Sequence, residues 1–162
     1  MIDMMGEYLT DHYGGSPGPG QSYRRNLDIL VEETGSQRAA ARALGIGEST
    51  LRGWLKGATP KKYSHRDIGL RTRAATINPD RWAAAYDGTN AMAIHGWIKV
   101  SRDVRHRTVH VGREIPQALM KRILTTWRNG RDNEAETLLR NAIELYYTSS
   151  MEFDQIEGVS FE

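Results

Sequence analysis

Residues 35–57 read GSQRAAARALGIGESTLRGWLKG, and the spacing of small, apolar and glycine residues predicts two short helices with a tight corner between them. Ser36 is a favourable N-cap, and the alanines after it favour a helix that another helix can approach closely. Gly45 comes directly after Leu44, where a helix commonly ends in a left-handed conformation that disfavours side chains. The first helix is therefore expected to stop at this glycine.

The second helix of this stretch is expected to bury one side and expose the other. Leu51, Trp54 and Leu55 lie at i, i+3 and i+4, so they share one helix face. This pattern is typical of a helix-turn-helix, whose second helix enters the major groove of DNA. An ordinary helical hairpin with a glycine corner is the alternative. The residues of this stretch expected to contact DNA are Gln37, Glu48, Ser49, Thr50, Arg52 and Lys56.

More basic residues follow the second helix. Lys61 and Lys62 fall in a loop, where we expect them to lie along the DNA backbone. The next helix then carries Arg66, Arg71 and Arg73 within a short span. Phosphate contacts from such residues position a protein on DNA without reading its sequence, and they make affinity salt-dependent. A solvated basic helix is the alternative interpretation.

The formal net charge of +2 hides a gradient along the chain. Residues 20–78 hold 11 Lys and Arg against 5 Asp and Glu, residues 79–131 hold 10 against 4, and residues 132–162 hold 1 against 8. Such asymmetry indicates a face for nucleic acid followed by an acidic end that stays away from phosphates. A solvated acidic helix and tail is the alternative.

Composition and missing motifs exclude several classes of function. The chain has no cysteine, so it forms neither disulfides nor a Cys-based zinc site. His106 and His110 lack an evident third ligand, and we expect no metal and no cofactor. The sequence has no GxxxxGK[ST] or HExxH motif and does not predict an enzyme. No apolar run approaches the roughly 18 residues of a membrane span, so we expect a cytoplasmic, nucleoid-associated protein without membrane contact.

The second half of the chain has a different periodicity. Residues 92–100 alternate as a strand does, and after a turn residues 104–112 are expected to return as a second strand. Two amphipathic helices are expected over residues 116–128 and 132–146. Residues 151–162 fit a short terminal strand or a packed tail.

The predicted fold class is α+β. An N-terminal all-α helix-turn-helix domain is expected over residues 22–88, followed over residues 89–162 by a β-hairpin, two helices and a short C-terminal strand. Residues 1–21, which include GGSPGPG, are expected to form a flexible tail. Arg105 and Arg107 make the hairpin a second candidate nucleic-acid surface, and the second domain is the expected site of homodimerisation or partner binding. A ribbon-helix-helix unit, whose single strand pairs with that of a second chain, is the alternative for this half.

The order of these elements resembles that of a known family. A helix-turn-helix is followed by a basic helix ending near Arg81, a strand pair running into VRHRTV at residues 104–109, two helices, and an acidic tail ending VSFE. In this order the chain is similar to the telomere-associated terminal proteins of linear actinobacterial chromosomes and plasmids. The resemblance implies covalent attachment to the 5′ end of linear DNA through a side-chain hydroxyl that primes a separate DNA polymerase. Ser101 and Thr108 are the candidates for this hydroxyl, with Thr89 as a further one.

Other functions stay open at the level of the sequence. A dimeric transcriptional repressor, or a partition adaptor of a plasmid or phage, predicts a palindromic operator with half-sites about 34–36 Å apart. A protein-interaction adaptor without DNA binding predicts no steep loss of DNA affinity with salt. A terminal protein predicts instead a partner polymerase or telomere-associated protein, and even then the chain is a primer substrate rather than an enzyme.

Overall fold

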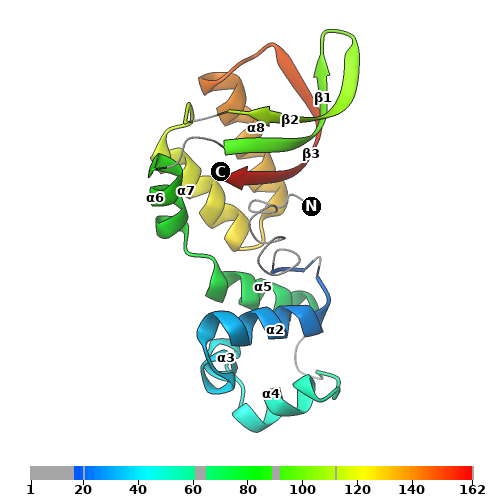
Figure 1. The fold of residues 1–162 in the computed structure, drawn as a ribbon, viewed down its shortest axis with the longest axis vertical. Helices are drawn as coiled ribbons and strands as arrows, with labels where there is room; N and C mark the ends of the chain where they lie inside the picture. The colour runs from blue at the N-terminus through cyan, green and yellow to red at the C-terminus, as the bar shows by residue number, and fades with distance from the viewer. Residues whose placement is uncertain (1–16, 20, 61–64, 89–91, 112, 162) are drawn as a thin grey trace. The chain divides into compact units, whose positions relative to one another are not determined.

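The computed structural model describes residues 17–19, 21–60, 65–88, 92–111 and 113–161 (Figure 1). These residues form two compact units, one within residues 17–78 and one within residues 79–161. The described elements of the first unit are all helices, whereas the second unit combines helices with a three-stranded antiparallel sheet. The predicted α+β fold class is confirmed.

The first unit consists of helices α2 (Tyr23–Thr34), α3 (Gln37–Leu44), α4 (Glu48–Leu55) and α5 (His65–Thr76). The N-terminus of α2 is fixed because the Ser22 hydroxyl accepts a hydrogen bond from the main-chain N–H of Arg25 at 3.2 Å. Helix α2 lies beside α5, and α3 packs against both of them (Figure 1). The α3–α4 corner is therefore held by two supporting helices.

One apolar core holds the first unit together. All four helices contribute buried side chains to it: Leu27, Leu30, Ala40, Ala41, Leu44, Leu51, Trp54 and Ile68. Ala40 and Ala41 are small enough to let the backbones of neighbouring helices approach, as the sequence indicated. Tyr23 and Ile46 pack against the edge of this core.

Residues 17–19 are docked against the first unit. The fully buried Asn26 side chain accepts a hydrogen bond from the N–H of Gly18 and donates one to the carbonyl oxygen of Gly18, both at 2.9 Å. Gly69 permits this approach, since a Cβ on it would lie 2.5 Å from the carbonyl carbon of Gly18. This docking differs from the flexible tail expected over residues 1–21; residues 1–16 lie outside the described part of the chain.

The second unit contains helix α6 (Pro79–Gly88), strands β1 (Met92–Val100) and β2 (Asp103–His110), helices α7 (Gln117–Arg128) and α8 (Asp132–Tyr146), and strand β3 (Met151–Phe161). The sheet has the strand order β2-β1-β3. The predicted hairpin is confirmed, and the C-terminal residues form a strand rather than a packed tail. Strand β1 pairs with β2 and β3 of the same chain. A ribbon-helix-helix unit would instead pair a single strand with that of a second chain.

Helices α7 and α8 lie on one side of this sheet (Figure 1). The side chains between them and the sheet form the second core, in which Ile94 and Ile98 of β1, Trp127 of α7 and Leu139 of α8 are fully buried. Because side chains alternate along a strand, His95 and Trp97, which lie between Ile94 and Ile98, face the opposite side of the sheet.

Helix α6 packs with the second unit, which begins at Pro79. Gln117 of α7 donates a hydrogen bond from Nε2 to the carbonyl oxygen of Ala83 at 3.0 Å, and Lys121 Nζ lies 2.5 Å from Asp80 Oδ1. This differs from the sequence-based expectation that residues 79–88 belong to the helix-turn-helix domain. Periodicity identifies a short amphipathic helix but does not show which neighbour buries its apolar side.

Candidate nucleic-acid interface

The corner between α3 and α4 has the geometry that the sequence predicts. The Ser36 hydroxyl accepts a hydrogen bond from the N–H of Ala39 at 3.0 Å and so caps α3. Gly45 ends α3 with φ 68°, in the left-handed region, and the N–H of Ile46 donates to the carbonyl oxygen of Ala41 at 3.0 Å. Gly47 then begins α4 without a side-chain cap. The conformation and hydrogen bonds of the main chain in this turn therefore set the direction of α4 relative to α3.

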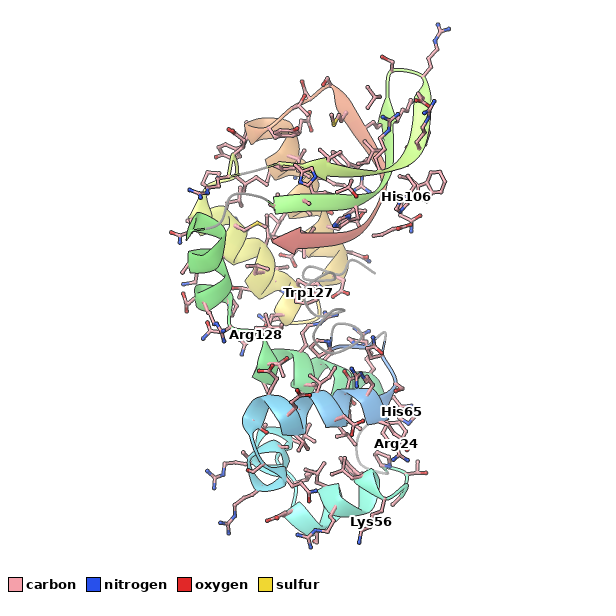
Figure 2. The ribbon with its side chains drawn as sticks, in the orientation of Figure 1. Arg24, Lys56, His65, His106, Trp127 and Arg128 are labelled. Atoms are coloured by element: carbon pink, nitrogen blue, oxygen red, sulfur yellow. The ribbon has the colours of Figure 1, made fainter. Side chains whose placement is uncertain are left out.

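Helix α4 divides into a buried side and an exposed side. Leu51 and Trp54 are 0 % and 5 % exposed, so the helix is anchored to the core of the first unit. The opposite side carries the residues predicted to contact DNA. Ser49, Thr50, Arg52 and Lys56 are exposed, and Glu48 is half-buried. Figure 2 shows Lys56 at the C-terminal end of this helix.

Arg52 is held by a neighbour on its own helix. Its Nη2 lies 3.3 Å from Oε1 of Glu48, one turn earlier, and both side chains are about half exposed, at 53 % and 41 %. Pairs of this kind on a helix surface contribute only about 0.3–0.5 kcal/mol. Arg52 can therefore exchange the carboxylate for a base edge or a phosphate at small energetic cost.

Helix α3 exposes two arginines that were not among the residues predicted to contact DNA. Arg38 and Arg42 are both exposed and lie four residues apart, hence on one side of the helix. Gln37, which is predicted to contact DNA, is half-buried at the first position of α3. In a helix-turn-helix the first helix crosses the DNA backbone, so cations on it suit phosphates. In the sequence, the i, i+4 spacing of the two arginines indicates that they share one side of the helix.

The basic residues beyond α4 differ in their accessibility. Arg66 is exposed, and the exposed Arg71 donates a hydrogen bond from Nη1 to the carbonyl oxygen of Leu44, at 3.4 Å. Arg73 is only 2 % exposed, and its Nε donates to the carbonyl oxygen of Pro17 at 3.3 Å. The expectation that Arg73 contacts phosphate is wrong, because a buried guanidinium engaged with the main chain does not reach DNA. Lys61 and Lys62 lie outside the described residues.

On the hairpin, one carboxylate holds both predicted arginines. Asp103 Oδ1 lies 2.9 Å from Nε of Arg105, and its Oδ2 lies 2.8 Å from Nη2 of Arg107. Arg105 is exposed, whereas Arg107 is half-buried and its Nε makes no hydrogen bond to a described residue. Asp103 therefore partly neutralises this basic surface, and Arg105 is the more accessible of the two.

The sheet face turned away from α7 and α8 brings polar and aromatic side chains from all three strands together. Register places His95 opposite Thr108 and Trp97 opposite His106. His95 Nδ1 lies 2.9 Å from the hydroxyl oxygen of Thr108, and His106 Nε2 lies 2.8 Å from Oε2 of Glu157 on β3. His106 also contacts the Trp97 ring edge to face, with centroids 5.8 Å apart (Figure 2 labels His106). Trp97 was not among the predicted site residues, although strand alternation places it on the face opposite the buried isoleucines.

Ser101, the other candidate hydroxyl, is exposed in the β1–β2 turn with φ 58°, a conformation uncommon for serine. It lines a hollow of about 590 Å³ together with Lys99, Glu152 and the hydroxyl-bearing residues 148–150. Lys99 Nζ lies 2.9 Å from Glu152 Oε2, and that hydrogen bond and the carboxylate charge raise the pKa of Lys99. The cation beside Ser101 is therefore already paired.

Comparison with protein-family models, with curated proteins and with solved structures gives no match for this chain. Within the described residues, no group of three or more His, Asp or Glu is placed to hold a metal ion. None of the described helices has both the length and the apolar character needed to cross a lipid bilayer.

Proposed function

We propose that the protein binds duplex DNA in a sequence-dependent manner, with α4 as the helix that enters the major groove. The observation that carries the proposal is the division of α4 into a side anchored by Leu51 and Trp54 and an exposed side that carries Ser49, Arg52 and Lys56. Such a helix presents its outward side chains to base edges while the core fixes its orientation.

The exposed residues have different roles in this proposal. Arg52 suits guanine, because one guanidinium donates two hydrogen bonds to the O6 and N7 acceptors of that base. Arg38 and Arg42 on α3 suit neighbouring phosphates of the DNA backbone that the first helix crosses. The base contact gives sequence preference, and the phosphate contacts give affinity that depends on salt.

The decisive experiment selects bound sequences from a random duplex library and then measures affinity for the enriched duplex. Arg52→Ala is expected to weaken that affinity by about 1–3 kcal/mol and to relax preference at one position. Arg38→Ala is expected to weaken binding of all duplexes equally. It is also expected to reduce the salt slope, which is the slope of log affinity against log salt concentration, by about one. No enrichment, together with affinity that is flat between about 50 and 200 mM salt, would favour a protein-interaction adaptor instead.

A second candidate function, protein priming, is favoured by the contact between His95 and Thr108. A hydroxyl within hydrogen-bond distance of an imidazole nitrogen is the arrangement that activates a nucleophile. In the proposed step Thr108 Oγ1 attacks the α-phosphorus of a deoxynucleoside triphosphate, pyrophosphate leaves, and the hydroxyl proton passes to Nδ1 of His95. A separate polymerase carries out this step, as the resemblance to terminal proteins implies.

Priming is tested by purifying the protein from cells that carry its gene naturally, digesting the nucleic acid and measuring the intact mass. A residual nucleotide that disappears in Thr108→Ala and persists in Ser101→Ala supports Thr108 as the primer. The reverse pattern assigns Ser101. Bare protein whose selected duplex site is palindromic would instead indicate a dimeric repressor or a partition adaptor.

A further inference from the structure

Helix α8 carries a line of side chains that the core of its own unit does not use. The buried residues of this helix, among them Leu139 and Ile143, pack in the core of the second unit. On another side, residues at positions i, i+4, i+7 and i+11 follow one line along the helix and form what we call the outer stripe: Glu134, Leu138, Asn141 and Leu145. Leu138 is half-buried, and the other three residues are exposed. The outer stripe therefore leaves about three turns of α8 accessible to a partner.

The C-terminal end of the outer stripe is apolar and negative. Leu145 is 73 % exposed, which is the highest value among the large apolar residues that the structure describes. Its neighbour Glu144 is also exposed, and the last turn of α8 holds no basic residue. The C-terminal end of a helix is in addition the negative end of its dipole. A partner for this end should offer a positive charge and space for an apolar side chain.

The N-terminal end of the outer stripe borders a surface with these properties. Helices α7 and α8 lie side by side (Figure 1), and a groove of about 350 Å³ opens beside Glu134. Its lining includes three cations, Lys121, Arg122 and Arg131. Lys121 lies against a carboxylate of α6, and Arg131 lies 3.0 Å from Glu134. Arg122 is exposed and has no carboxylate partner in the described part of the chain, so the groove keeps a positive charge.

We propose that two copies of the chain associate through antiparallel α8 helices, about a two-fold axis that crosses the outer stripe between Leu138 and Asn141. In a two-fold interface, a contact of residue i with residue j is repeated as j with i. Leu145 of each copy then lies at the groove beside Glu134 of the other copy. The negative end of each α8 meets Arg122 of the other copy, so apolar contact and charge attraction both occur twice.

Other arrangements offer less to a second copy. Parallel α8 helices would bring the two negative ends together and the two basic grooves together. On the open face of the sheet, Lys99 already pairs with Glu152 of the same chain, at 2.9 Å. Charge on that face therefore does not favour a second copy, whereas the two ends of the outer stripe are complementary.

The proposed interface is small. Helix α8 has 15 residues and is about 22 Å long. One helix and one groove from each copy bury less than the roughly 1,200–2,000 Å² of a stable complex, so the dimer is expected to dissociate on dilution. A duplex with two half-sites would hold two copies together, which would link this dimer to the proposed DNA binding. The dimer itself does not rest on DNA binding, and a measurement without DNA tests it separately.

The test is sedimentation equilibrium of the full chain without DNA, at concentrations from about 10 μM to 1 mM. The wild type is expected to show a monomer–dimer equilibrium. Leu145→Arg removes the apolar contact and places a cation against Arg122 of the other copy, so the dissociation constant is expected to rise at least tenfold. Arg122→Glu is expected to raise it as well, because it places a carboxylate at the negative end of the other α8. A monomer at all concentrations, or an unchanged dimer in Leu145→Arg, overturns the proposal.

Combining the two substitutions tests the antiparallel arrangement. In Leu145→Arg with Arg122→Glu the charges are again opposite, and the dissociation constant is expected to fall below that of either single variant. Within one chain Leu145 is about 16 Å along α8 from Glu134, which lines the groove with Arg122, so recovery requires contact between copies. Trp97→Ala is the control and is expected to leave the dimer unchanged. No recovery in the double variant, or a dimer that only Trp97→Ala dissociates, contradicts pairing through α8.

Discussion

Arg24 donates a hydrogen bond from Nη2 to the main-chain carbonyl oxygen of Leu55, across 3.1 Å and 31 positions of sequence. Leu55 is the last residue of α4, where helix carbonyls lack partners within the helix and the helix dipole is negative. The guanidinium supplies both a donor and a positive charge at that end. Figure 2 shows Arg24 on α2 beside the end of the helix that carries Lys56. A residue of the supporting helix thus fixes the far end of the helix proposed to read DNA.

Replacing Arg24 with alanine is expected to destabilise the first unit by about 0.5–1.5 kcal/mol, because a charge-assisted hydrogen bond at a helix C-terminus is lost. Urea unfolding followed by circular dichroism measures this change. Duplex affinity is also expected to fall while its salt slope stays constant, since Arg24 orients α4 and does not contact phosphate. Arg25→Ala, which removes the same charge one position later, is the matched control. A reduced salt slope in Arg24→Ala would assign the residue to phosphate binding.

Trp54→Ala is expected to cost about 3–5 kcal/mol, because it empties a large volume of the core beneath α4. The 5 % exposure of Trp54 and its place among leucines from three helices support this magnitude. A thermal or urea melt provides the measurement, and Trp54→Phe is expected to lose much less. A Trp54→Ala melt near that of wild type would show that α4 is not anchored as described.

Alanine at two glycines of the first unit is expected to change stability in opposite directions. At Gly69 the new Cβ would lie 2.5 Å from the main chain of Gly18, so residues 17–19 must move and Asn26 loses its partners; the cost is expected to be about 1–3 kcal/mol. At Gly53 the new Cβ meets only the Ala58 Cβ, at 3.9 Å. There the higher helix propensity of alanine is expected to add up to about 1 kcal/mol. Equal shifts in a urea titration would contradict the docking of Gly18.

The sequence predicted features that depend on neighbours within one or two turns. The Ser36 cap, the left-handed Gly45 and the shared face of Leu51 and Trp54 are fixed by the local backbone, and the structure has all of them. The hairpin was predictable for the same reason, since strand alternation and a short turn are local signals.

Features that depend on distant partners were not predictable. Arg73 looked like one more surface cation, but its partner, the carbonyl oxygen of Pro17, lies 56 residues away. The pairing of β3 with β1 likewise joins two strands that α7 and α8 separate in the sequence. Local pattern identifies a charged or apolar residue, and only the tertiary structure determines which of these residues remain accessible at the candidate site.

Removing the Asp103 carboxylate is expected to strengthen duplex binding through the hairpin arginines. Asp103 pairs with Arg105 at 2.9 Å and with Arg107 at 2.8 Å, so Asp103→Asn releases positive charge on the hairpin. Each additional phosphate contact is expected to steepen the logarithmic dependence of duplex affinity on salt by about 0.9. Arg105 should supply this contact, since Arg107 is half-buried.

The matched control is Asp154→Asn on β3, which changes net charge equally but lies at an exposed position of the acidic strand. It is expected to shift affinity only slightly and to leave the slope unaltered, because no arginine of the hairpin is released. Anisotropy titrations of both variants at several salt concentrations give the comparison. If both variants gain affinity equally, net charge rather than the Asp103 contact governs binding, and the hairpin arginines do not contact phosphate.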